Sequence, residues 1–114
     1  MNTEGALTLH SDTDGATATL AAIGEIDLGT APRFREAALG ALADVRTLHL
    51  DLSGVSFMDS SGLHVLLATK ERADLLGAEL VLTRVPRPVG RLLDISGLST
   101  EFARDEGDGV AAPG

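Results

Sequence analysis

The chain of 114 residues is 44% hydrophobic and 23% charged, which suits one small folded domain and excludes a disordered chain. Nine basic against 17 acidic residues give a formal net charge of −8, which argues against nucleic-acid partners and anionic membrane surfaces. The chain has no cysteine, which excludes disulfides and thiolate metal sites, and residues 1–5 lack a leader-like pattern, so we expect a cytoplasmic protein.

Alternating apolar and polar residues in the first part of the chain predict two strands. Residues 6–10 and 16–23 alternate in this way. The segment between them, 11–15, consists of the Ser, Asp, Thr and Gly residues that are typical of turns. We therefore expect an antiparallel hairpin, with residues 24–27 ending its second strand.

The middle of the chain predicts a helix, a strand and a second, longer helix. The first helix should begin near Thr30, because Thr is a fair N-cap and Pro32 is tolerated only in the first helical turn. Residues 45–52 alternate again and predict a strand, and residues 53–59 are expected to form a connection. The strongest helical pattern covers residues 60–76.

The last part of the chain predicts one more strand and a short helix. Gly77 stands where a helix C-terminal glycine would, and residues 78–85 then predict a strand. Residues 87–94 predict a helix that Gly97 stops. We expect residues 104–114, which are rich in Gly and acids, to form a flexible tail.

The predicted element order is β-β-α-β-α-β-α, which defines an α/β fold. The opening hairpin is antiparallel, whereas the strand–helix–strand unit over residues 45–85 should form a right-handed parallel crossover. We expect a single domain over residues 1–103, with a mixed sheet of four to five strands covered mainly on one face by helices.

The segment Asp59, Ser60, Ser61 and Gly62 joins a strand region to the predicted start of a helix. Backbone N–H groups lack partners at a helix start, so a phosphoryl group on a serine there would be stabilised as a bound anion is. Gly62 would also allow another backbone to approach closely. On the pattern alone, however, an ordinary N-cap explains this composition better. Residues 24–27 also end a strand and could lie beside this segment.

Other site chemistries find little support in the sequence. It contains no G-x-S-x-G element, no phosphate-binding glycine loop and no dinucleotide fingerprint. His10, His49 and His64 are too scattered for a helical metal site. We therefore expect no enzymatic activity, no metal and no cofactor.

Three segments together resemble the STAS-domain family of bacterial anti-sigma factor antagonists. Residues 50–63, LDLSGVSFMDSSGL, resemble the central motif of that family, and residues 24–27, GEID, resemble an earlier element. Residues 89–98, VGRLLDISGL, resemble the C-terminal helix and the turn after it. The segments occur in the family's order and spacing over nearly the whole chain.

The resemblance implies a phosphorylation switch, with Ser60 as the phosphoacceptor. In this family an anti-sigma factor, a serine kinase with a histidine-kinase-like ATPase fold, phosphorylates this serine with ATP and magnesium. The unphosphorylated antagonist binds the anti-sigma factor and releases the sigma factor for transcription. A PP2C-type phosphatase restores the active form.

The resemblance assigns further residues to the same site. Asp27 and Asp59 carry over as acids that line it. Ser61 and Gly62 should shape the loop and the partner contact, and Met58 is assigned either to the partner interface or to ordinary packing. The alternative is a STAS domain that does not switch, either a scaffold subunit or a sensor of a small ligand; it shares the fold but has no kinase partner.

Overall fold

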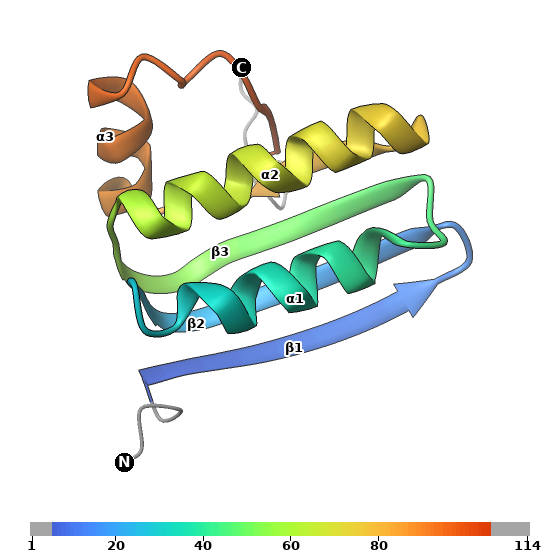
Figure 1. Ribbon diagram of the computed structural model, residues 1–114, viewed down its shortest axis with the longest axis horizontal. Coiled ribbons are helices and arrows are strands. Elements are labelled where there is room, and N and C mark those ends of the chain that lie inside the picture. The colour runs from blue at the N-terminus through green and yellow to red at the C-terminus, as the bar shows by residue number, and fades with distance from the viewer. Residues whose placement is uncertain (1–5, 106–114) are drawn as a thin grey trace.

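A computed structural model describes residues 6–105, which form one five-stranded sheet and three helices (Figure 1). The sheet has the strand order β1 (Leu7–Asp14), β2 (Thr17–Ile26), β3 (Thr47–Met58), β4 (Glu79–Thr83) and β5 (Ala103–Asp105). The helices are α1 (Ala31–Leu42), α2 (Ser60–Leu76) and α3 (Arg87–Ile95). Only β1 is antiparallel to its neighbour; β2, β3, β4 and β5 run parallel.

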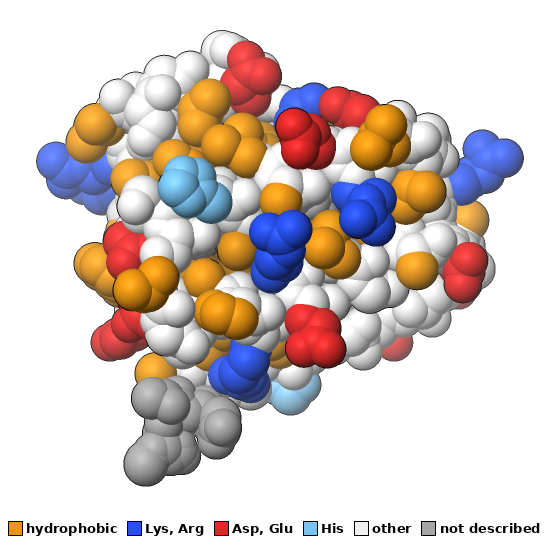
Figure 2. All heavy atoms as spheres, in the orientation of Figure 1, with side chains coloured by type: hydrophobic (Ala, Val, Ile, Leu, Met, Phe, Trp, Pro, Cys, Tyr) orange, Lys and Arg blue, Asp and Glu red, His pale blue; other side chains and the backbone are white. Residues whose placement is uncertain are grey.

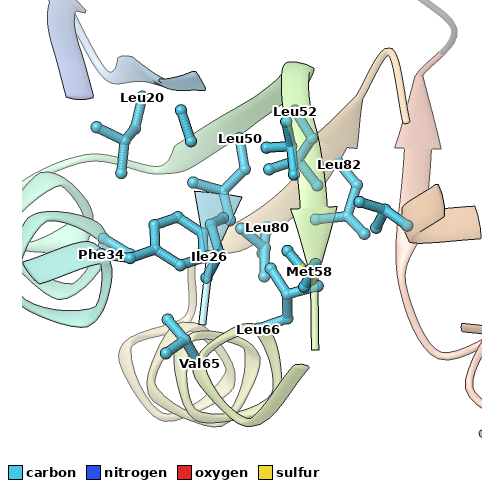
Figure 3. Packing of buried hydrophobic residues seen from close by; sticks show 14 of the residues in the cluster. Leu20, Ile26, Phe34, Leu50, Leu52, Met58, Val65, Leu66, Leu80 and Leu82 are labelled. Carbon is cyan, nitrogen blue, oxygen red and sulfur yellow. The ribbon is translucent and has the colours of Figure 1, made fainter. Parts of the chain in front are cut away.

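Helices α1 and α2 lie side by side across one face of the sheet, so the fold has two layers (Figure 1). The core lies between the layers, where Leu20, Leu50 and Leu82 of the sheet meet Phe34 of α1 and Leu66 of α2 (Figure 3). All five side chains are at most 1% exposed. The expected α/β fold with a mixed sheet and helices mainly on one face is confirmed. Within residues 6–105, no helix is long and apolar enough to cross a membrane.

The helices follow the sequence closely. Helix α2 occupies the predicted residues 60–76, and Gly77 ends it in the left-handed conformation, with a φ of 72°. Helix α1 has Thr30 at its N-cap position and Pro32 in its first turn. The ends of α2 are set by local capping and glycine geometry, which a sequence displays directly.

The predicted ends of β2 and β3 are wrong, because both strands continue into segments expected to be connections. Strand β3 includes residues 53–58 and β2 includes residues 24–26, and the two pair as far as Ile26 and Met58 with two register shifts. A Cβ on Gly54 would lie 2.8 Å from the Ile23 side chain. Glycine at position 54 therefore serves close packing of neighbouring strands rather than a turn.

The first strand also extends beyond its predicted end. Residues 11–14 were expected to be a turn but pair with β2, Ser11 opposite Leu20 and Asp14 opposite Thr17. The connection is only two residues long, and Gly15 adopts a φ of 64° there. A two-residue hairpin requires such left-handed geometry, and the extra pairing outweighs the turn propensity of Ser and Asp.

The expected tail is ordered at its beginning. Arg104 and Asp105 were assigned to a flexible segment but belong to β5, which pairs in parallel with β4. Three residues are too few to show a hydrophobic period, so the sequence alone gives no sign of this edge strand. The rest of the expected tail, residues 106–114, lies outside the described residues.

Candidate functional site

Two segments were singled out in the sequence, residues 24–27 and 59–62. They meet where β2 and β3 end. Ile26 and Met58 are register partners at the ends of β2 and β3, and the backbone N–H of Asp59 donates to the carbonyl of Ile26 at 3.2 Å. Asp27 and Asp59 are therefore the first residues beyond two adjacent parallel strands. The carboxyl edge of a parallel sheet is where α/β proteins commonly place their sites.

Asp59 is the N-cap of α2. Its Oδ1 accepts a hydrogen bond from the Ser61 N–H at 2.8 Å, and its backbone carbonyl accepts from Gly62 and Leu63 at 3.1 and 3.2 Å. The capping interpretation of this segment is therefore correct for Asp59. It also changes the expectation for an anion at Ser60, because the Ser61 N–H is already occupied by a carboxylate.

Asp27 holds the turn between β2 and α1. Its Oδ1 accepts from the N–H groups of Gly29 and Thr30 at 3.0 and 3.1 Å. The Thr30 hydroxyl donates to the carbonyl of Glu25 at 2.9 Å, so Thr30 occupies the N-cap position of α1 without capping the helix through its side chain. The turn presents Leu28 to solvent, with 80% of its surface exposed.

Ser60 is the first residue of α2 and is exposed. Among the described residues its hydroxyl makes no hydrogen bond. Its neighbour Ser61 is half-buried and lines a groove of about 290 Å³ between α1 and α2, together with Leu28, Arg35 and His64. The Ser60 hydroxyl is therefore accessible to a protein that approaches the start of α2.

Gly62 and Met58 serve packing beneath the exposed serine. A Cβ on Gly62 would lie 2.6 Å from Cγ of Met58 and 2.8 Å from Cγ2 of Ile26. Side chains, not the expected backbone, thus approach this glycine. Met58 is 6% exposed and belongs to the core (Figure 3), which supports the packing assignment.

A second groove, of about 420 Å³, lies between the end of β3 and α3. We call it the α3 groove; it is lined by Phe57, Met58, Arg87, Pro88, Arg91, Leu92 and Ile95. Sequence reasoning missed it. The available signal was Phe57, an apolar residue next to the buried Met58 and hence on the opposite side of the strand, where it is 47% exposed.

One ion pair and one further hollow lie away from the ends of β2 and β3. Burial alone would raise the pKa of Asp51, but hydrogen bonds from Ser53 and the ion pair with Arg84 together lower it. A hollow of about 620 Å³ lies at the opposite edge, beside Gly15 and Asp44. Across residues 6–105 no group of His, Asp and Glu side chains is arranged to hold a metal ion.

Residues 9–108 match the family described as the STAS domain, and the chain belongs to that family. The anti-sigma-B factor antagonist of Staphylococcus aureus (strain NCTC 8325 / PS 47) is 33% identical over 88 residues, which cover 76% of this chain and 82% of that protein.

Solved structures show the same fold. An anti-sigma factor antagonist from Mycobacterium paratuberculosis superimposes with a TM-score of 0.81 at 26% identity, covering 95% of this chain and 92% of that one. The anti-sigma factor antagonist SpoIIAA in its unphosphorylated form gives 0.74 at 20% identity over 89% and 90% of the two chains. Its phosphorylated form gives 0.69 at 19% identity over 89% and 94%.

Proposed function

We propose that this chain is an anti-sigma factor antagonist whose binding is switched by phosphorylation of Ser60. The observation that carries the proposal is the exposed Ser60 hydroxyl, which has no hydrogen-bond partner within residues 6–105 and directly follows the N-cap Asp59. The unphosphorylated form binds the anti-sigma factor and frees the sigma factor. The chain acts by binding and is not itself an enzyme.

The position of Ser60 makes a phosphate there a strong local change. Phosphorylation adds about −1.5 to −2 charges, and the nearest capping position is already held by the Asp59 carboxylate. The new anion must therefore compete with Asp59 for the Ser61 N–H or find its partners elsewhere. Asp27, at the end of the adjacent strand, adds a further negative charge to the same edge. A partner that fits the neutral serine would meet repulsion.

The proposed partners follow from the resemblance to the family. A kinase-type anti-sigma factor supplies the phosphate from ATP, and a PP2C-type phosphatase removes it, in the cytoplasm. Two findings support this assignment: a Staphylococcus aureus relative carries the name anti-sigma-B factor antagonist, and the similar protein SpoIIAA has been solved in unphosphorylated and phosphorylated forms.

Calorimetric titration against the kinase-type anti-sigma factors of the same genome tests the switch. Ser60→Asp should lower affinity about 5- to 150-fold, the range of a coupling free energy of about 1–3 kcal/mol. Ser60→Ala should bind as the wild type does. Ser11→Asp, which adds the same charge at an exposed position of β1, is the matched control and should leave affinity unchanged. If Ser60→Asp bound as tightly as the wild type, a STAS scaffold that does not switch would be favoured.

A further inference from the structure

The α3 groove exposes apolar side chains at both of its walls. Phe57 at the end of β3 is 47% exposed, and Ile95 at the end of α3 is 82% exposed. Leu92, which is half-buried, and Met58, which is buried, also line the groove. Val89 and Leu93 already anchor α3 in the core, so neither Phe57 nor Ile95 is needed to hold the helix in place.

Two arginines flank this apolar surface. Arg87 and Arg91 are one helical turn apart on α3, line the groove and are exposed. Neither makes an ion pair within residues 6–105, whereas Lys70 pairs with Asp74 and Arg84 with Asp51. In a chain with a net charge of −8, two arginines one helical turn apart in a groove lined by no acidic side chain form a local positive patch. Figure 2 shows basic and hydrophobic side chains together at the α3 end of the molecule.

The groove begins close to Ser60 along the chain. Phe57 and Met58 line the groove, and the chain passes from them through Asp59 directly to Ser60. A protein that covers the Ser60 hydroxyl therefore reaches the groove by extending along the end of β3. The groove lies on the other side of this strand end from the hollow between α1 and α2.

We propose that the α3 groove docks an acidic amphipathic segment of the same anti-sigma factor. Apolar side chains of that segment pack between Phe57 and Ile95, and its carboxylates face Arg87 and Arg91. A second copy of this chain is a poor occupant, because a symmetric contact through this groove would place the arginines of both copies together. The identity of the partner rests on the proposed function. The chemistry of the groove does not.

The chemistry is tested without the partner, using a synthetic amphipathic peptide as the probe. The peptide carries Leu on one helical face and Glu beside it; a matched peptide carries Lys in place of Glu. In an NMR titration of the full chain, the Glu peptide should shift the amide signals of Phe57, Leu92 and Ile95. The Arg87→Glu, Arg91→Glu double variant should weaken this binding about tenfold or more. Equal shifts with the Lys peptide, or no shifts with either peptide, would overturn the proposal.

Two further outcomes would assign the groove to a different occupant and so contradict the proposal. If the same signals move in the Glu106→Gln, Asp108→Asn variant without any peptide, the chain's own C-terminal segment occupies the groove. If they move with protein concentration alone, a second copy does.

A second experiment uses the anti-sigma factor that binds the wild-type chain. The Arg87→Glu, Arg91→Glu variant should lose about tenfold or more in affinity, and this loss should shrink at high salt. Arg46→Glu with Arg72→Glu makes the same change in net charge at exposed positions away from the groove and should bind normally. If the Arg87→Glu, Arg91→Glu variant bound normally while Ser60→Asp bound weakly, docking at the α3 groove would be contradicted. The proposed switch would stand.

Discussion

At the scale of single residues, Gly62 decides how closely α2 packs on the ends of β2 and β3. A methyl group at this position would overlap the buried side chains of Met58 and Ile26. Gly62→Ala should therefore lower the free energy of unfolding by about 1–3 kcal/mol, measured by urea denaturation.

Gly40 provides the matched control for this substitution. It lies inside α1, and a Cβ there would meet nothing within 4 Å. Gly40→Ala should raise the free energy of unfolding by about 0.5–1 kcal/mol, because alanine loses less backbone entropy in a helix. A stabilising Gly62→Ala would show that the space beside Met58 is larger than described.

Asp51 gives the stability of the protein a specific dependence on pH. Hydrogen bonds from Ser53 and the ion pair with Arg84 hold the pKa of this carboxyl below its ordinary value of 3.8, against the effect of burial. A depressed pKa stabilises the fold above the unfolded-state pKa and loses that contribution as the pH falls through the folded-state pKa.

Asp51→Asn should therefore cost about 1 kcal/mol of unfolding free energy at pH 7, a modest value because Arg84 is half-exposed. The difference from the wild type should be constant between about pH 5 and 8 and shrink as the pH falls below 3.8, the ordinary pKa of the carboxyl. Urea denaturation across this range measures it. A difference that grew on acidification would have the wrong sign for a depressed pKa.

At the scale of secondary-structure elements, the start of α2 depends on Asp59. Asp59→Ala removes the acceptor of the Ser61 N–H and should destabilise the protein by about 0.5–2 kcal/mol. Amide exchange of Ser61 should accelerate at the same time. Asp59→Asn keeps a capping oxygen and should stay close to the wild type in both measurements. Equal losses in the two variants would mean that the charge, not the hydrogen bond, holds the helix start.

The same scale shows what the sequence could predict and what it could not. The ends of α2 are predictable because Asp59 and Gly77 act on the backbone next to them. The ends of β2 and β3 are not, because pairing between strands about 30 residues apart overrides the local preference of Gly24 and Gly54 for turns. The place of Ser60 at the start of α2 was predictable from a continuous motif, whereas the α3 groove joins residues about 30 to 40 positions apart in the chain.

At the scale of the whole molecule, one core links the sheet and the three helices. Buried residues from Leu7 in β1 to Leu93 in α3 and Phe102 before β5 belong to a single cluster. Unfolding should therefore be one cooperative transition, with a calorimetric enthalpy equal to the van't Hoff enthalpy. At about 0.7 kcal/mol per residue, residues 6–105 contribute about 70 kcal/mol. Differential scanning calorimetry measures both values. A separate early transition would contradict a single cooperative core.

The most direct test of the phosphorylation switch is intact-mass measurement of the chain after incubation with ATP, magnesium and each kinase-type anti-sigma factor of the same genome. We predict the addition of one phosphate to the wild-type chain by one of these proteins, and no addition to Ser60→Ala. If Ser60→Ala also gained a phosphate, the acceptor would be another residue. No addition with any candidate, on a folded wild-type chain, would contradict the switch.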